Sequence, residues 1–466
     1  MIHKLFYKNF SLIISFLLWF FLFGSINVYP KDLLNIKSLF DIIKTSRIII
    51  PIMIGILIFI FLLIKIYTNK KKINISNYLS IFFFIFFFQL IGAFFADRIN
   101  FETLYVIFFS FIIIILFILI EYLEIQRIYY YFLYSLIFFI LISSVILLAL
   151  KLDAFLLGVK DLNFYSIFHP DLTLIGYPPP RSTGYSRMLT ILVVFIVIWI
   201  ENKKKSFNSP YFYLILLLAS AILLFQSRGS YLCYIVSIIS IIFILNYKNN
   251  LFTKLIKLIL YIFGPILIIF FLSIVTHSKD SIEAGYLNQD SNSSKNIKNS
   301  IEDLKNNRIV SNKSTTGRVD LWLIGLNEFN KKKFFGYGPQ ADRIIITEYY
   351  KKIEHNNNPY GNNISNGLIY TFLSGGYFSA LLFIILYIKN ISYILKYIKK
   401  FKNKIHLPTQ LSFIYIIVFS VRSLFENSYA VWGIDHMFLL VSMGILNYQL
   451  MNKKIYEGFS INSLLK

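Results

Sequence analysis

Long apolar runs separated by short polar connections constrain this chain more than any other feature. A helix needs about 20 mainly apolar residues to cross a bilayer, and stretches such as "NYLSIFFFIFFFQLIGAFF" at 77–95 have that length and character. Of the 466 residues, 57% are hydrophobic and only 15% are charged. A soluble domain could not hide that much apolar surface. The sequence therefore predicts an all-α polytopic membrane protein.

The length rule predicts about 12 transmembrane helices along the chain. We place them at residues 10–28, 48–66, 77–95, 103–120, 132–150, 186–200, 211–226, 230–246, 256–276, 366–388, 408–425 and 431–450. The first run follows a basic start and lacks a persuasive small-residue cleavage site, so we interpret it as a retained helix. The single cysteine, Cys233, excludes an intrachain disulfide.

Basic clusters predict the orientation of these spans. Clusters such as "KIYTNKKKIN", "ENKKKSFNSP" and "NYKNNLFTKLIK" all fall on one side of the alternating scheme, which should be the cytoplasm. Both termini are then cytoplasmic, and we expect the protein in the bacterial inner membrane. Much of the net charge of +23 becomes a topology signal instead of a nucleic-acid surface. The chain is predicted to be one integral membrane domain, 1–466, with a large periplasmic loop, 277–365, inserted between helices 9 and 10.

Arg228 occupies the polar break "QSRGS" between two apolar runs. A hairpin between membrane helices needs a polar turn, and Ser-Arg-Gly is a simple one. The predicted topology, however, places this turn on the outer face, where the charge rule does not require a cation. Arg228 is therefore a candidate functional residue, with Ser227 and Gly229 interpreted as the turn that holds it.

Two further arginines follow the prolines of "GYPPPRSTGYSR" in the preceding outer loop. Three successive prolines keep the chain extended and deliver Arg181 to the foot of the next span. Arg187 follows about one and a half turns later. Both could be simple interface anchors, but we favour a functional role for Arg181.

The large loop contains a predicted amphipathic helix with Arg318 in its first turn. The helical spacing of apolar residues defines its predicted buried face, and Thr315 or Thr316 would cap it. The apolar residues are Val319, Trp322, Leu323, Leu326 and Phe329. A cation at a helix N-terminus is unfavourable for the helix itself, which suggests an anion site. "FFGYGP", residues 334–339, is interpreted as the glycine-containing turn that ends this helix.

Polar residues flank the last three predicted spans. His355, in "HNNN", can accept a proton near neutral pH, and Gly367, Gly375 and Gly376 suggest close packing in the next span. Arg422 and Glu426 stand one helical turn apart and are most simply interpreted as a structural ion pair. The pattern assigns no role to Asp435 and His436.

In their order along the chain, these motifs resemble the O-antigen ligase and polymerase family of membrane glycosyltransferases. The resemblance rests on the "SRG" turn, on "TGRVDLWLIGLNEFNKKKFFGYGP", and on "HNNN" before a glycine-bearing span, and it covers about residues 175–450. It implies transfer of a glycan from undecaprenyl diphosphate, on the periplasmic face, to a lipid A core or a growing polysaccharide. It also implies no cofactor, and the sequence shows no outer pattern of metal ligands.

The resemblance further implies a different role for each group of polar residues. Arg181, Arg228 and Arg318 would bind the diphosphate, because arginines offer permanent, bidentate contacts to phosphate oxygens. His355 would be the catalytic base on the acceptor hydroxyl or would orient that hydroxyl. Arg187, Arg422 and Glu426 are possible supporting residues. The choice between ligase and polymerase stays open.

Two other classes of protein remain as alternatives. A transporter or flippase of lipid-linked saccharides would place ionisable groups near the bilayer midplane, often in broken helices, whereas the charges here lie mostly near the ends of the predicted spans. A structural partner in envelope synthesis would tolerate changes at the arginine and histidine positions.

Overall fold

The computed structural model describes a large part of the chain. The described residues are 49–68 with gaps, 75–97, 99, 101–122, 126–150, 182–203, 209–225, 227–245, 250–287, 318–352, 363–401, 406–427, 429–430 and 433–451. The predicted first span and the candidates Arg181 and His355 lie outside these residues.

The described residues form helices and no β-strand. The helices are α3 (Asn77–Phe95), α4 (Phe101–Tyr122), α5 (Gln126–Leu150), α7 (Ser182–Asn202), α8 (Pro210–Leu224), α9 (Arg228–Ser240) with the π-helical turn η3 (Ile241–Leu245), α10 (Leu251–Leu287), α12 (Arg318–Phe329), α13 (Ala341–Lys352), α14 (Gly367–Phe401), α15 (Leu407–Arg422) and α16 (Ile434–Met451). The all-α class expected from the sequence is what the structure shows.

Six of the described helices are long and apolar enough to cross a membrane, by length and composition. These spans are Asn77–Phe95, Thr103–Tyr122, Gly184–Asn202, Arg228–Leu245, Leu251–Ile274 and Gly367–Lys399. Shorter apolar helices lie beside them, such as Pro210–Leu224 and Leu407–Arg422. The chain is therefore a multi-pass membrane protein, although six candidate spans are fewer than the twelve expected.

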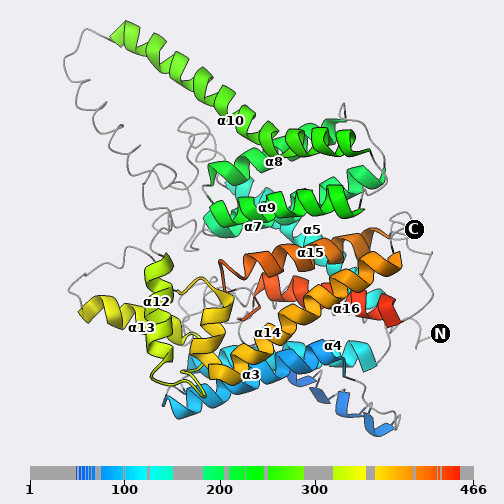
Figure 1. The fold of residues 1–466 in the computed structure, drawn as a ribbon, viewed down its shortest axis with the longest axis vertical. Coiled ribbons are helices and arrows are strands. Elements are labelled where there is room, and N and C mark those ends of the chain that lie inside the picture. The colour runs from blue at the N-terminus through cyan, green and yellow to red at the C-terminus, as the bar shows by residue number, and fades with distance from the viewer. Residues whose placement is uncertain are drawn as a thin grey trace.

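The membrane helices run roughly side by side in two groups with a shared centre (Figure 1). In this view α7, α8, α9 and α10 form the upper group, α3, α4 and part of α14 form the lower group, and α15 and α16 lie between them. The central position of α15 and α16 agrees with their burial, because side chains such as Tyr415 and Phe438 are fully buried. In contrast, α10 exposes many large apolar side chains, as a lipid-facing helix does.

A small lobe made of α12 and α13 covers one end of the bundle. Figure 1 shows α12 crossing this end at a steep angle to α3 and α14. Leu321, Ile324 and Phe329 pack into the lobe, whereas Val319 and Leu323 are exposed. The predicted buried face of this helix is therefore wrong at Val319, Leu323 and Leu326, and it is confirmed at Phe329 and, in part, at Trp322. The face that packs is the one that meets Ile364 and Ile369, since a Cβ at Gly325 would lie 2.7 Å from Ile364.

The lobe is attached to the bundle where α14 breaks. Gly376 has φ 67° and ψ −161° inside α14, a conformation that is essentially restricted to glycine. The break leaves backbone groups of α14 without intrahelical partners, and the lobe supplies them: the Tyr337 and Gly338 amides donate to the Leu373 and Ser374 carbonyls, both at 2.8 Å. The Tyr377 amide in turn donates to the Lys333 carbonyl at 2.9 Å.

Glycines allow this close approach between two backbones. A Cβ at Gly376 would lie 2.1 Å from the Phe334 carbonyl oxygen, and one at Gly336 would lie 2.5 Å from the Leu373 carbonyl oxygen. The "FFGYGP" segment is thus more than the predicted turn at the end of a helix. Its backbone forms the hydrogen bonds that the broken part of a membrane helix lacks, and such bonds are required where a helix breaks in an apolar environment. We call the segment 333–338 the splint.

Uncharged polar side chains pair at the bundle end opposite the lobe. Asn202 of α7 and Gln410 of α15 exchange two amide hydrogen bonds, at 2.6 and 3.1 Å. Thr409 donates to Gln449 of α16 at 2.7 Å, and Gln449 donates to the Tyr130 hydroxyl at 2.9 Å. We call this group the amide layer. It joins α5, α7, α15 and α16 through hydrogen bonds between neutral groups.

Candidate active site

Ser227 lies just before α9 at the lobe end of the bundle. Arg228 and Gly229 are the first residues of α9, so α9 begins inside the turn expected at Ser-Arg-Gly, and only Ser227 of that turn precedes the helix. An added Cβ at Gly229 would meet no atom within 4 Å, so no close packing demands glycine there. Arg228 is exposed on the first turn of α9, which places a guanidinium at this end of the bundle.

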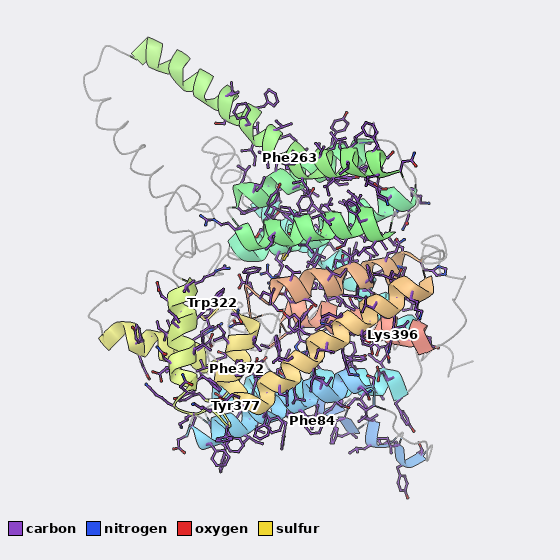
Figure 2. The ribbon with its side chains drawn as sticks, in the orientation of Figure 1. Phe84, Phe263, Trp322, Phe372, Tyr377 and Lys396 are labelled. Carbon is purple, nitrogen blue, oxygen red and sulfur yellow. The ribbon has the colours of Figure 1, made fainter. Side chains whose placement is uncertain are left out.

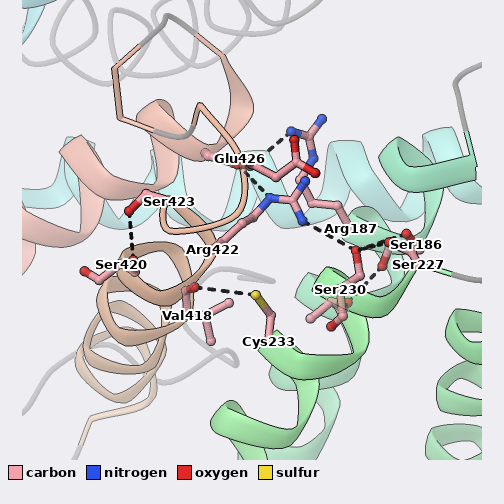
Figure 3. Close-up of polar contacts among 12 residues, drawn as sticks. Ser186, Arg187, Ser227, Ser230, Cys233, Val418, Ser420, Arg422, Ser423 and Glu426 are labelled. Carbon is pink, nitrogen blue, oxygen red and sulfur yellow. Dashed lines mark hydrogen bonds and ion pairs between the residues drawn. The ribbon is translucent and has the colours of Figure 1, made fainter. Parts of the chain in front are cut away.

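Ser230 lies at the centre of a buried group of hydroxyls (Figure 3). Its Oγ is 2.9 Å from Ser227 Oγ and 3.0 Å from Ser186 Oγ, which belongs to α7. The Arg422 guanidinium donates to the same oxygen at 3.4 Å. This hydroxyl group therefore connects the first turns of α7 and α9 to the last residue of α15.

A buried carboxylate joins two arginines beside these hydroxyls. Asp435 accepts from Arg422 Nε at 2.9 Å and from an Arg187 guanidinium nitrogen at 3.2 Å. The Asp435 and Arg422 side chains are each only 7% exposed. Asp435 lies in the first turn of α16, where the helix dipole favours a negative charge. A carboxylate that bridges two guanidiniums fixes both of them in place.

Glu426 connects this group to the lobe. Its carboxylate lies 3.6 Å from the Arg318 guanidinium, with the two side chains 27% and 31% exposed. Glu426 also interacts electrostatically with Arg422. The predicted pair of Arg422 and Glu426 on one helical turn is wrong, because α15 ends at Arg422. The close ion-pair partners are Asp435 for Arg422 and Arg318 for Glu426.

These contacts bring together residues from four separate parts of the chain. Arg318 begins α12, as the sequence predicted, and it reaches the bundle end that carries Arg187 and Arg422. We call Arg187, Arg228, Arg318, Arg422, Glu426 and Asp435 the arginine cluster. Three guanidiniums pair with the two carboxylates, and Arg228 adds a fourth guanidinium in the first turn of α9, so positive charge exceeds negative charge within these six residues.

A second buried carboxylate holds the connections around the cluster. Asp342 of α13 accepts from the Ile364 amide at 3.2 Å and from the Asn427 side chain at 3.3 Å. Asn427 accepts from the Asn366 amide at 3.0 Å. Burial raises the pKa of Asp342 above its usual range, partly offset by the Ile364 amide and by Arg343. The residue after Glu426 is therefore tied to α13 and to the start of α14.

His355 falls between α13 and this anchored segment, outside the described residues, and Arg181 lies just before α7. The described residues on either side of His355 are held by the lobe: Lys352 ends α13, and the Ile364 carbonyl accepts from the indole of Trp322 at 2.9 Å. The contacts of His355 and Arg181 with the cluster stay predictions. Among the described residues, no group of three or more His, Cys, Asp or Glu side chains could hold a metal ion.

The sequence patterns assigned no role to Asp435 and gave no sign of Ser186 and Ser230. Asp435 is 248 residues from Arg187 in the chain, so no local pattern could pair them. One signal was available: an aspartate just inside an apolar helix is costly in a membrane unless it has a partner of opposite charge. Serines are common in membrane helices, and Ser186 and Ser230 gave no such signal.

Fixed guanidiniums at the end of a helical membrane bundle suit an anionic substrate that stays in the membrane. Bidentate arginine contacts match phosphate or carboxylate oxygens, whereas the buried hydroxyls hold the first turns of α7 and α9 against Arg422. The class of protein is therefore a multi-pass membrane protein with an arginine-rich end.

Comparison with known families identifies the class of protein more closely than the structure does. Residues 212–384 match the family described as O-antigen ligase, which confirms the resemblance to the O-antigen ligase and polymerase family and indicates a glycosyltransferase-like enzyme. The matched region includes Arg228, Arg318 and His355, whereas Arg187, Arg422, Glu426 and Asp435 lie outside it. A search of curated proteins gives no match to the chain.

Proposed function

We propose that this protein transfers a glycan from undecaprenyl diphosphate to an acceptor hydroxyl, without a bound metal. The acceptor would be a lipid A core for a ligase or a growing polysaccharide for a polymerase. The observation that carries the proposal is the arginine cluster, in which four guanidiniums outnumber two carboxylates at one end of the bundle. Two of the four, Arg228 and Arg318, lie within the region that matches the O-antigen ligase family.

The proposal includes a membrane topology. About 12 spans in one integral domain, 1–466, would place both termini in the cytoplasm and the loop 277–365 in the periplasm. The protein would then lie in the bacterial inner membrane with the arginine cluster on the outer side. The arrangement of the lobe supports this topology, because α12 and α13 cover the same bundle end as the cluster (Figure 1).

Donor binding would depend on arginines that are not fully neutralised by protein carboxylates. The diphosphate would contact Arg228 and Arg318, with Arg181 as a third cation. Glu426 pairs with Arg318 across 3.6 Å, so a diphosphate oxygen would replace the Glu426 carboxylate at that guanidinium. Arg187 and Arg422 are held by Asp435 and would support the site by their charge and position.

The transfer step requires one bond to form and one to break. The acceptor hydroxyl oxygen would attack the anomeric carbon of the donor sugar, and the bond from that carbon to the diphosphate oxygen would break. The hydroxyl proton would pass to His355, or His355 would orient the hydroxyl. Negative charge that develops on the leaving diphosphate would be stabilised by the arginines, and loss of one such contact typically lowers the rate by about 100-fold or more.

The test is substitution of the two cluster arginines within the matched region. Arg228→Ala and Arg318→Ala should each abolish glycan transfer in cells while the protein still inserts in the membrane. Lys396→Ala is the matched control, because this cation lies on α14 toward the end remote from the lobe (Figure 2). Near-normal transfer by both arginine variants would overturn the assignment of the site.

Deleting the gene separates the two possible acceptors. Loss of a ligase would leave long glycan attached to the lipid carrier. Loss of a polymerase would leave surface lipopolysaccharide with a single repeat. Neither result occurs if the protein is instead a transporter or flippase of lipid-linked saccharides, because the donor would then accumulate on the cytoplasmic side.

A further inference from the structure

Aromatic and lysine side chains gather where the lobe meets the edge of the bundle. We call Phe94, Phe95, Lys331, Lys333, Phe334 and Tyr377 the aromatic–lysine surface; all six are exposed. Phe334 is 66% exposed and Phe94 is 63% exposed. Contact with water is unfavourable for large apolar side chains with this exposure. We therefore expect an apolar partner from outside the described residues to cover them.

The surface continues the apolar flank of two membrane spans. Phe84 and Phe87 of α3 and Leu381 and Ile384 of α14 are also exposed, and both helices are apolar enough to cross a membrane. Figure 2 labels Phe84 and Tyr377 along the edge formed by these helices. Lipid covers such flanks in a membrane protein, and the segment 331–335 meets Phe95, the last residue of α3.

Stacked rings connect the lobe to this flank. Phe335 stacks on Phe95 at 4.7 Å between ring centroids and on Phe378 at 6.2 Å. Phe378 also stacks on Phe88 at 5.1 Å. Lys332 donates to the Phe95 carbonyl at the end of α3 at 3.1 Å. The segment is therefore fixed against the ends of both spans, and Phe334 stays largely exposed although its ring meets the Tyr377 ring edge-on at 6.3 Å.

The charges of the segment indicate the chemistry of its partner. Three successive lysines precede Phe334, and Lys331 and Lys333 are exposed. Glu328 pairs with Lys331 at 2.6 Å. This one negative charge does not balance the positive charges of Lys332 and Lys333. Lysines beside aromatic rings at a membrane boundary can place their stems along the lipid and their ammonium groups among the headgroups.

We infer that the aromatic–lysine surface binds the anionic phospholipids of the bilayer and anchors the lobe to the membrane. Phe334 enters the boundary of the acyl region, and Lys331 and Lys333 contact headgroup phosphates. The α12 helix has 12 residues and is about 18 Å long. One of its ends then rests on lipid while the other holds Arg318 beside Glu426. The inference depends on the exposed surface and not on the reaction proposed above.

Depth measurement tests the anchor directly. A nitroxide is attached to Phe334→Cys, in full-length protein that carries Cys233→Ala, and the protein is reconstituted in vesicles of phosphatidylglycerol and phosphatidylcholine. The matched control is Glu348→Cys, an exposed position on α13 of the same lobe. We expect residue 334 to be accessible to oxygen dissolved in lipid and residue 348 to be accessible to a water-soluble relaxation agent. Equal accessibility of both positions to the water-soluble agent would overturn the inference.

A label at 334 that is shielded from both agents would also overturn it, because that result would indicate a protein partner. The lysines are tested by the Lys331→Gln, Lys333→Gln double variant. It should lower the preference of the protein for phosphatidylglycerol over phosphatidylcholine by about fivefold or more. The double variant with arginine at both positions keeps the charge and should keep the preference. An unchanged preference in the glutamine variant would refute the choice of an anionic lipid.

Discussion

The same three helices carry very different polar groups at their two ends. At one end, α7, α15 and α16 contribute Asn202, Gln410 and Gln449 to the amide layer. At the other end, they contribute Arg187, Arg422 and Asp435 to the arginine cluster. The amide layer consists of neutral groups that satisfy one another, whereas the cluster contains net positive charge and is partly exposed.

We interpret this difference as a difference in role between the two ends of the bundle. Neutral, reciprocal hydrogen bonds fix helix positions at a modest gain in free energy. A buried ion pair is weak support for stability, because the cost of desolvating the charges offsets their attraction. The excess of guanidiniums over carboxylates in the cluster is therefore better explained by the proposed binding of an anionic donor than by stability. We therefore predict that substitutions at the two ends will differ in their effects on stability and on glycan transfer.

The largest loss of stability is expected from a substitution at the centre of the arginine cluster. Asp435→Ala leaves Arg187 and Arg422 without their shared carboxylate, and breaking a buried pair typically costs about 3–5 kcal/mol of stability. Thermal unfolding in detergent, monitored by size-exclusion chromatography, measures this loss. The triple variant Arg187→Met, Arg422→Met, Asp435→Leu replaces all three charged groups and should recover most of the stability but not glycan transfer. Recovery of transfer in that variant would contradict a functional role for Arg422.

A second variant detaches the lobe without removing any charge. Gly376→Ala strains the backbone by about 1–3 kcal/mol and also places a Cβ 2.1 Å from the Phe334 carbonyl. We expect faster proteolysis of the lobe and loss of transfer, because Arg318 loses its fixed position. Gly184→Ala is the control, since a Cβ there would meet no atom within 4 Å. Equal proteolysis of the two variants would contradict the role of the splint.

A smaller effect is expected in the amide layer. Gln410→Ala leaves the Asn202 amide without its reciprocal partner, which typically costs about 1–3 kcal/mol. The midpoint of thermal unfolding should fall, whereas transfer per folded molecule should remain close to that of the unchanged protein. A loss of transfer that exceeds the loss of folded protein would show that the two ends are not separate in function.

The smallest effect concerns pH and the Asp342 carboxyl. Because burial raises its pKa in the folded protein, its contribution to stability is full below the pKa of the unfolded chain, about 3.9, and is lost as pH rises through the higher folded value. Protection factors, which correct hydrogen exchange for the slower intrinsic exchange of every amide at lower pH, should therefore rise in residues 363–367 as the pH falls through that folded value. Asp342→Asn should remove this part of the pH dependence. A steeper pH dependence in that variant would refute the assignment.

The sequence predicted much of this fold because apolar runs and helices coincide. The ranges expected at 77–95, 103–120 and 186–200 match α3, α4 and α7 closely. Arg318 was expected in the first turn of a helix and begins α12. These features depend on local spacing, which the sequence displays directly.

The remaining features depend on contacts between distant parts of the chain. The buried face of α12 was predicted from spacing, but Leu321 and Ile324 pack inward because they meet Ile364 and Ile369. Close packing between helices, suggested by Gly375 and Gly376, is confirmed at Gly375, where a Cβ would lie 3.3 Å from the Gln89 backbone nitrogen of α3. Gly376 instead breaks its helix and meets a loop backbone. Asp435 carried no assigned role because its partners, Arg187 and Arg422, come from two other helices.

The splint between the lobe and α14 also limits how such proteins can be recombined. Gly336 and Gly338 of the lobe fit against Leu373 and Ala93, and Gly376 fits against Phe334. The backbone of a lobe taken from a relative would follow a different path and would not fit the helix break in α14 of this protein. Chimeras that exchange only the lobe should misassemble, whereas those that exchange it together with α3 and the first half of α14 should fold.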